Sequence, residues 1–218
     1  MIVLNTNVSY FNNIWIEPPI ERILYRLGYR KGKTVLTKEQ EEEIEKLIWE
    51  ALSLCRPKGA FLILPILKRD EESVTIGEHI IKSRSLSKLL KYSDDVALMA
   101  STIGHEIIDS INNEIKKGNS VKAVTFDSTA SQVADKTVEW VMEYINNTLK
   151  KEARRLTSFR YSPGYGDLDL KYQEMFFKEL NLEKLEMSLT KSFMMVPEKS
   201  VTAICGVEKF EGKEDTNE

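Results

Sequence analysis

The chain has 218 residues, of which 42% are hydrophobic and 30% are charged, and its formal net charge is −3. This length and composition fit one large soluble globular domain, or at most two small ones. Lysine and arginine are interspersed with acidic residues, so no basic field attracts nucleic acid or an anionic membrane. Met1 to Phe11 lacks the features of a signal peptide, and no stretch has the length of a membrane span. We therefore expect a cytoplasmic protein.

Two cysteines and two histidines limit the metal and disulfide chemistry open to the chain. Cys55 and Cys205 could form one bridge, but both lie in apolar sequence, which favours two buried small hydrophobic residues. His79 and His105 share no metal-binding spacing with the cysteines. The sequence thus predicts no metal site.

The first part of the chain predicts two helices and a strand. Pro18 to Arg30 is expected to be helical, because proline suits a first turn and apolar residues follow at helical spacing. A second helix begins after Thr37, which forms a capping box with the glutamine three residues later, and continues to about Cys55. Ala60 to Leu67 is a short apolar run typical of a buried strand, and Pro65 within it indicates an edge or a bulge.

The rest of the chain mixes strands and helices without regular alternation, which favours an α+β fold. The predicted strands are Asp95 to Thr102 and Val121 to Phe126, with a strand, loop and strand over Lys191 to Gly206. The predicted helices are His105 to Lys117, capped by Gly118, the long Ser128 to Glu152, and Asp169 to Leu180. A loop from Ser158 to Leu168 separates the last two helices.

That loop contains the most informative stretch of the sequence, Arg160-Tyr161-Ser162-Pro163-Gly164-Tyr165-Gly166-Asp167. Arginine offers a planar fork that matches a carboxylate. The glycines and the proline let the backbone bend tightly and approach a ligand, while Tyr165 adds a flat ring with a hydroxyl. Together these residues suit a small zwitterion that carries an aromatic base. The same composition is also typical of a plain surface turn.

Two ordered blocks resemble a known family. Arg160-x-x-x-Gly164-Tyr165 is similar to the RxxxGY motif of the activation domain of cobalamin-dependent methionine synthase, and Leu189 to Val201 (LTKSFMMVPEKSV) resembles its "LTESFxMxPxxSV" segment at the right separation. Further similarity is found at 95–104 (DVALMASTIG) and 133–144, with a weaker match at Ile16-Glu17 and Leu27-Gly28.

The resemblance implies a single α+β domain whose mixed, mostly antiparallel twisted sheet is flanked by helices. Residues 1–94 would form its N-terminal part, 95–207 the core with the RxxxGY loop, and 208–218 a charged tail. The family continues past the "SV" segment with more strand and a tyrosine near the ligand, whereas this sequence passes into the tail. Glu152 stands in for an acidic residue that the family has shortly before RxxxGY.

The resemblance also implies a site for S-adenosylmethionine (AdoMet). Arg160 would hold the methionine carboxylate, and Gly164 and Tyr165 would contact the adenosine, with Ser162 and Pro163 in the same loop. Glu17 and Glu139 align with two acidic positions of the family site, and a carboxylate suits the ammonium and sulfonium of AdoMet. On the residues alone, the favoured readings are a solvated helix residue for Glu139 and, for Glu17, a charge favoured by a helix N-terminus.

The implied function is activation of a methionine synthase in trans. A flavodoxin- or ferredoxin-type donor reduces inactive cob(II)alamin on a synthase that lacks its own activation domain, and the AdoMet held here methylates the cobalt to give methylcobalamin. No catalytic side chain is needed, because the nucleophile is the cofactor's cobalt. The loop Pro197 to Ser200 is the expected face toward the cobalamin-binding partner. The alternatives are reactivation of another corrinoid methyltransferase and a non-catalytic interaction module.

Overall fold

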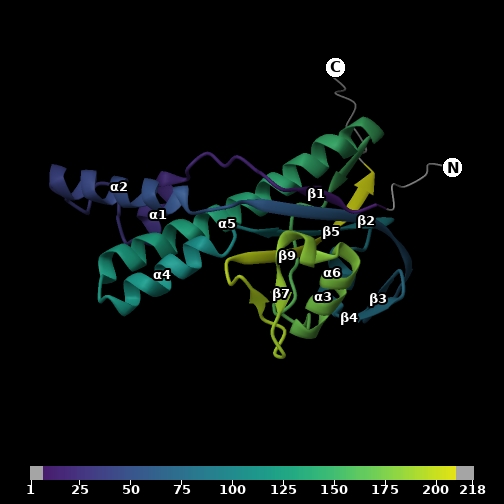
Figure 1. The fold of residues 1–218 in the computed structure, drawn as a ribbon. Helices are drawn as coiled ribbons and strands as arrows, with labels where there is room; N and C mark the ends of the chain where they lie inside the picture. The colour runs from purple at the N-terminus through teal and green to yellow at the C-terminus, as the bar shows by residue number, and fades with distance from the viewer. Residues whose placement is uncertain (1–6, 210–218) are drawn as a thin grey trace, which may run out of the picture.

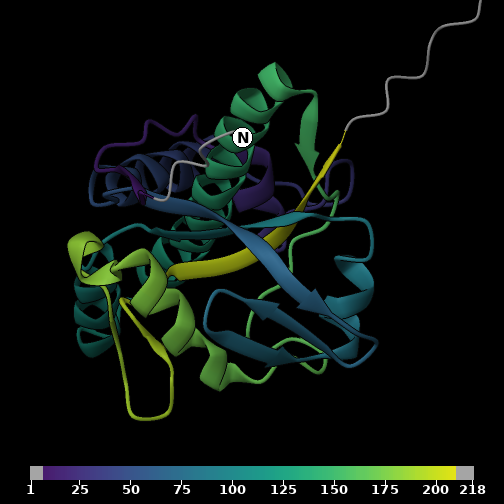
Figure 2. The ribbon, with the colours of Figure 1, turned by 90° about the vertical axis from the view of Figure 1, so that its right-hand side faces the viewer.

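The computed structural model describes residues 7–209, which form an antiparallel sheet with helices on both faces (Figures 1 and 2). The seven-stranded sheet has the order β4-β3-β2-β5-β9-β6, with β1 beside β2. Its strands are β1 (Ser9–Phe11), β2 (Lys58–Arg69), β3 (Ser73–Ile76), β4 (His79–Lys82), β5 (Asp95–Thr102), β6 (Arg154–Leu156) and β9 (Ser200–Lys209). A separate hairpin joins β7 (Ser188–Leu189) to β8 (Met195–Val196). The α-helices are α1 (Ile20–Arg26), α2 (Lys38–Ser53), α3 (Arg84–Leu89), α4 (Glu106–Lys116), α5 (Ser120–Leu149) and α6 (Gln173–Leu180).

Strand β5 is the centre of the sheet and separates two hydrophobic cores. It pairs with β2 and β9 over its whole length, and all eight of its residues are buried. Because side chains alternate along a strand, Val96 and Leu98 face the core under α3 and α6, while Ala97 and Met99 face the core under α5. An apolar run without polar alternation therefore marks a strand covered on both faces.

The 30-residue helix α5 organises the other face of the sheet. Its C-terminal half packs Val138, Val141 and Ile145 against the sheet. Its N-terminal half extends beyond the sheet and packs with α2 and α4 around a third core that contains Phe126 (Figure 1). One long helix thus joins the sheet to a helical extension.

The structure confirms the α+β class and most of the predicted elements, although several are shorter than expected. The first helix covers only 20–26, and the one predicted from Asp169 begins as a 3-10 turn before α6. Thr37 makes both bonds of the predicted capping box. Pro65 lies beside a register shift between β2 and β3, at Ile66 and Lys68, so the indicated bulge is confirmed.

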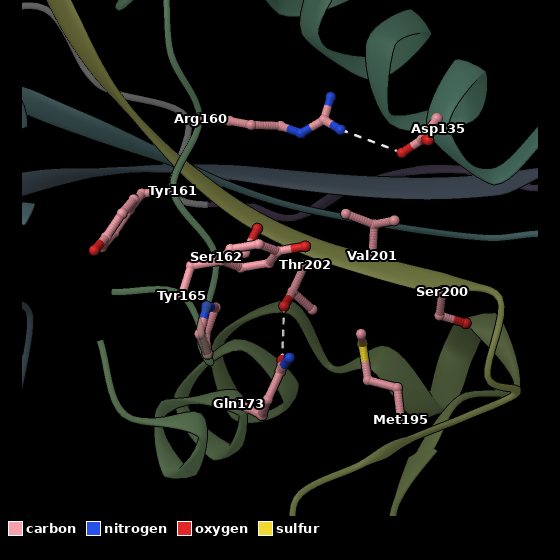
Figure 3. A pocket seen from close by; sticks show the side chains of 11 residues that line it. Asp135, Arg160, Tyr161, Ser162, Tyr165, Gln173, Met195, Ser200, Val201 and Thr202 are labelled. Carbon is pink, nitrogen blue, oxygen red and sulfur yellow. Dashed lines mark hydrogen bonds and ion pairs between the residues drawn. The ribbon is translucent and has the colours of Figure 1, made fainter. Parts of the chain in front are cut away.

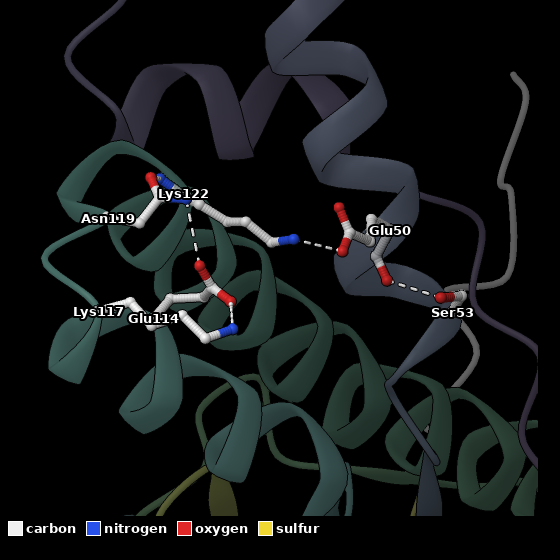
Figure 4. A network of polar contacts seen from close by, with 6 residues as sticks. All are labelled: Glu50, Ser53, Glu114, Lys117, Asn119 and Lys122. Atoms are coloured by element: carbon white, nitrogen blue, oxygen red, sulfur yellow. Dashed lines mark hydrogen bonds and ion pairs between the residues drawn. The ribbon is translucent and has the colours of Figure 1, made fainter.

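The strand predicted at Val121 to Phe126 is wrong, because this segment is the start of α5. Its β-branched residues suggested a strand, yet Val121 and Val124 are 63% and 56% exposed, whereas Ala123, Thr125 and Phe126 are buried. The Asn119 side chain caps the helix through the Lys122 N–H. A polar network around this turn ties it to α4 and α2 (Figure 4). Capping and tertiary packing therefore override strand propensity here.

Several elements had no counterpart in the sequence analysis, namely β1, the β3–β4 hairpin, α3 and β6. All are short, and β1 and β6 also pair with strands that are distant in the sequence, as when β6 joins the end of β9. Glu208 and Lys209, expected in the tail, continue β9, and the remaining tail residues lie outside the described part of the chain, as do the first six.

Both cysteines are free and buried, as predicted, and burial raises the pKa of each thiol to about 12. They belong to different cores, Cys55 to the helical extension and Cys205 to the α5 face of the sheet. Among residues 7–209, no helix is both long and apolar enough to cross a membrane.

Candidate functional site

The RxxxGY loop lies along the edge of β9, next to the place where β6 ends. β6 pairs with β9 only at 207–209, and further along the edge Tyr161 makes an isolated bridge to Ile204, with backbone bonds of 2.9 and 2.8 Å in both directions. Beyond this bridge, residues 200–203 of β9 have no strand partner on that side among the described strands. The unpaired edge leaves room for a cavity.

The bridge also decides where Arg160 points. Tyr161 packs against the core under α3 and α6. Because neighbouring side chains of extended backbone point to opposite faces, Arg160 turns to the α5 face. There its Nη2 lies 3.4 Å from Oδ1 of Asp135. Both side chains are partly exposed, so the guanidinium keeps donor capacity for a second anionic partner.

A cavity of about 450 Å³ opens at this edge, which lies within the range that small-molecule sites occupy (Figure 3). The loop supplies one wall and β9 another, and single residues from α5, α6 and β8 complete the lining. The lining side chains include Asp135, Arg160, Ser162, Tyr165, Gln173, Met195 and Thr202. Tyr165 is 70% exposed, so its ring is available to a ligand.

Two glycines give the loop its shape. Gly164 has φ +91° and donates its N–H to the Leu168 carbonyl at 2.7 Å, which closes the turn that presents Tyr165. Gly166 has φ +54°, and a Cβ there would lie 2.2 Å from Oη of Tyr161. A side chain at 166 would therefore meet both backbone strain and a steric clash.

Asp167 anchors the loop to the rest of the molecule. Its carboxylate accepts hydrogen bonds from the Ser83 hydroxyl at 2.6 Å and from the backbone N–H groups of Arg84 and Ser85 at 2.7 and 3.2 Å. The bond from Ser83, with those of the backbone, lowers the pKa of Asp167 to about 2. The end of the RxxxGY turn is thereby fixed to the start of α3.

The opposite wall of the cavity lies on the α6 face of β9. Gln173 is only 3% exposed, and its Oε1 accepts a 2.6 Å hydrogen bond from the hydroxyl of Thr202, which is 1% exposed. Met195 of β8 lines the same wall. In Figure 3, Arg160 and Asp135 lie on one side of β9, and Gln173 and Met195 on the other. The cavity therefore reaches around the strand edge.

Glu17 and Glu139 line a second pocket, of about 400 Å³, together with Trp15 and Trp140. Glu139 pairs with Arg22 at 2.9 Å and with Lys136 at 2.8 Å. Burial raises the pKa of Glu139, but the hydrogen bonds and charges of Lys136 and Arg22 outweigh it, so the pKa is lowered overall. This carboxylate is thus already neutralised by two cations.

The structure therefore divides the predicted site residues between two pockets. Arg160, Ser162, Pro163 and Tyr165 line the cavity at the β9 edge, and Gly164 shapes its turn, whereas Glu17 and Glu139 lie in the other pocket. The two are neighbours along α5, since Asp135 and Glu139 are one helical turn apart. Glu152, the expected stand-in, pairs with Arg154 at 3.5 Å instead.

Asp135, Gln173 and Thr202 were not among the site residues predicted from the sequence. Asp135 could have been found from its spacing of four to Glu139, which places both on one helix face. Gln173 and Thr202 carry no such signal, because their proximity depends on how α6 packs on β9. Ser200 lines the same cavity as Arg160, so the end of the Pro197 to Ser200 loop lies beside the RxxxGY loop.

Fold and site together are those of an α+β domain with an arginine and a tyrosine at a cavity of the size that small-molecule sites have. Residues 79–209 match the family model described as vitamin B12 dependent methionine synthase, activation domain. The chain belongs to this family. The matched range contains the whole cavity at the β9 edge but not Glu17.

Among solved structures, the chain is similar to the MetH reactivation domain bound to AdoHcy. The TM-score is 0.65 and the sequence identity 14%, and the similarity covers 92% of this chain and 78% of the other. At this identity the likeness concerns the fold. Among curated proteins, none matches the chain.

Proposed function

We propose that this protein binds AdoMet in the cavity at the β9 edge and supports the reductive methylation of a cobalamin held by a methionine synthase. The observation that carries the proposal is Arg160, a partly exposed guanidinium at the mouth of a cavity that lies wholly within the range matched by the activation-domain family. A solved neighbour on the same fold binds AdoHcy, the product that AdoMet leaves after methyl transfer.

The residues present fit an amino-acid ligand with an aromatic base. Arg160 would bind the carboxylate in the forked geometry of guanidinium–carboxylate pairs. Asp135, at 3.4 Å from Arg160, would then lie near the neighbouring ammonium. Tyr165 would cover the adenosine with its ring, and the positive φ of Gly164 keeps that turn close to the ligand.

The contribution of the chain is positioning. AdoMet supplies the methyl group, and the cobalt of the partner's cobalamin accepts it. The side chains described above hold the ligand so that the sulfonium methyl faces outward, and fixed orientation alone can contribute several kcal/mol, up to about 7–11, to such a reaction. The anchored Asp167 keeps the loop in place without the ligand.

We further propose that the cobalamin partner is a separate polypeptide and that a flavodoxin- or ferredoxin-type donor supplies the electron. Action in trans is compatible with the fold, because residues 7–209 contain a seven-stranded sheet, three cores and helices on both faces. The loop at Pro197 to Ser200 lies beside the cavity and is the proposed face toward the partner.

Two measurements test the proposal. Calorimetric titration with AdoMet and AdoHcy should give saturable binding, and absence of heat and of thermal shift at millimolar ligand would refute it. Reconstitution with a reductant and an oxidised synthase that lacks its activation region should restore methionine formation. AdoMet binding without restored methionine formation, together with reactivation of another corrinoid methyltransferase, would support the AdoMet site but identify that methyltransferase as the partner.

A further inference from the structure

Gln173 is a buried polar side chain that the binding of an amino acid at Arg160 does not use. It opens α6, lines the cavity at the β9 edge and is 3% exposed. A buried amide normally satisfies both its oxygen and its nitrogen with partners. The oxygen accepts from Thr202 at 2.6 Å, but no described residue accepts a hydrogen bond from Nε2. A donor is thus held in the cavity wall without a protein partner.

Gln173 lies on the other side of β9 from Arg160, so it would meet the opposite end of the proposed ligand. Arg160 and Asp135 lie on the α5 side of β9, whereas Gln173, Thr202 and Met195 lie on the α6 side (Figure 3). A ligand whose carboxylate is bound by Arg160 and whose ring contacts Tyr165 must cross the strand edge. The end that reaches Gln173 is then the base.

Amide chemistry indicates which base edge fits. A glutamine amide is complementary to adenine, because its oxygen accepts from the N6 amino group while its nitrogen donates to N7. An amide oxygen has two lone pairs, so the bond from Thr202 leaves one free. In the structure the amide oxygen is the end that meets the Thr202 hydroxyl, which leaves the amide nitrogen as the other end.

We propose that Gln173, oriented by Thr202, reads the N6/N7 edge of adenine and makes the cavity selective for adenosyl ligands. This assignment rests on the proposed AdoMet site. Hypoxanthine presents an oxygen in place of the N6 amino group, so two acceptors would meet at the glutamine oxygen. A bidentate amide–adenine contact is worth about 1–3 kcal/mol of discrimination, or roughly 5- to 140-fold in affinity.

The test compares AdoHcy with S-inosylhomocysteine by calorimetry on the full chain. Wild type should prefer AdoHcy by roughly 5- to 140-fold. In Gln173→Leu the preference should fall toward 1, with AdoHcy weakened and S-inosylhomocysteine nearly unchanged, so the second ligand also reports on folding. Equal binding of both ligands to wild type, or an unchanged preference in Gln173→Leu, would overturn the assignment. Binding of neither ligand to wild type would instead remove the proposed AdoMet site.

Two further variants keep the test decisive. Gln173→Glu has the same shape but places an oxygen opposite N7, an acceptor that both ligands carry. It should therefore weaken both ligands and keep the preference set by the oxygen opposite N6, and its loss of AdoHcy affinity replaces the readout of Gln173→Leu if that variant does not fold. Thr202→Val keeps the amide but frees its orientation, so the preference should fall only in part. An unchanged affinity for AdoHcy in Gln173→Glu contradicts the proposal.

Discussion

Two arginine–carboxylate pairs lie one turn apart along α5, and they differ in what surrounds them. Arg22 and Glu139 are 2.9 Å apart, and Lys136 completes a compact cluster in which the carboxylate has two cationic partners. Arg160 and Asp135 are 3.4 Å apart, with no further anion on Arg160 among the described residues, and they open into the β9-edge cavity. A charged residue that stands out in the sequence, such as Glu139, can therefore already be paired within the protein and have no free charge for a ligand. The pair with looser geometry is the one able to exchange its partner for a ligand.

The largest expected effect comes from the two arginines. Arg160→Ala should weaken AdoHcy binding by about 2–3 kcal/mol, because a charged, hydrogen-bonded ligand group loses its partner. Arg22→Ala is the matched control, since it removes an arginine whose partner is also on α5, and it should change affinity by less than about 1 kcal/mol. Calorimetry on both variants measures the difference. Equal losses of AdoHcy affinity in the two variants would contradict the proposal that only the Arg160–Asp135 pair binds the ligand.

A smaller effect is expected from the turn that presents the cavity wall. Gly166→Ala should be destabilising by about 1–3 kcal/mol, because the added Cβ would lie 2.2 Å from Oη of Tyr161 at a left-handed backbone position. Gly77→Ala is a matched control, with φ +55° against +54° and no atom within 4 Å of the added Cβ. Denaturant unfolding of both variants separates the clash from the backbone strain. A Gly77→Ala variant that loses as much stability would show that the approach of Tyr161 is unimportant.

The anchor of the loop should depend on pH. The pKa of Asp167 is lowered to about 2 in the folded protein, below its ordinary value of 3.8. Its stabilisation is therefore fully present above pH 3.8 and lost as the pH falls toward 2. Asp167→Asn should lower Tm by about 2–4 °C at neutral pH. The difference in Tm between this variant and wild type should become smaller below pH 4. A difference in Tm that stays constant down to pH 2 would argue against the Asp167 carboxylate as the anchor of the loop.

The smallest effect is expected from the second pocket. Glu139→Gln should change AdoHcy affinity by less than about 1 kcal/mol, because the carboxylate is already paired with Arg22 and Lys136 in a partly exposed setting. Surface plasmon resonance or calorimetry suffices to measure it. A loss as large as that of Arg160→Ala would mean that the ligand extends along α5 into both pockets and breaks these pairs on binding.

Local signals in the sequence were enough to predict the strands and helices that depend on neighbouring residues. The buried run at 95–102, the capping box at Thr37 and the glycine turn at 164–166 all follow from short-range chemistry. The start of α5 was missed because valines at 121 and 124 favour a strand locally, while Asn119 and Phe126 decide for a helix.

The site was predictable only where one segment contributes several of its residues. Arg160, Ser162, Pro163 and Tyr165 are close in the chain and lie together in the cavity. Gln173 and Thr202 meet across 29 positions, and Asp135 and Arg160 across 25, so their proximity depends on the packing of helices against β9. The charge state of Glu139 likewise depended on Arg22, 117 positions away.

Burial of Cys205 has a consequence for a protein proposed to handle an alkylating ligand. Its sulfur lies 3.6 Å from the Phe159 carbonyl, one residue before Arg160, and removal from water raises the pKa of the thiol to about 12. Only the thiolate is a strong nucleophile. Cys205 is fully buried and does not line the cavity, and its thiol stays protonated at physiological pH, so the proposed sulfonium ligand would meet no thiolate there.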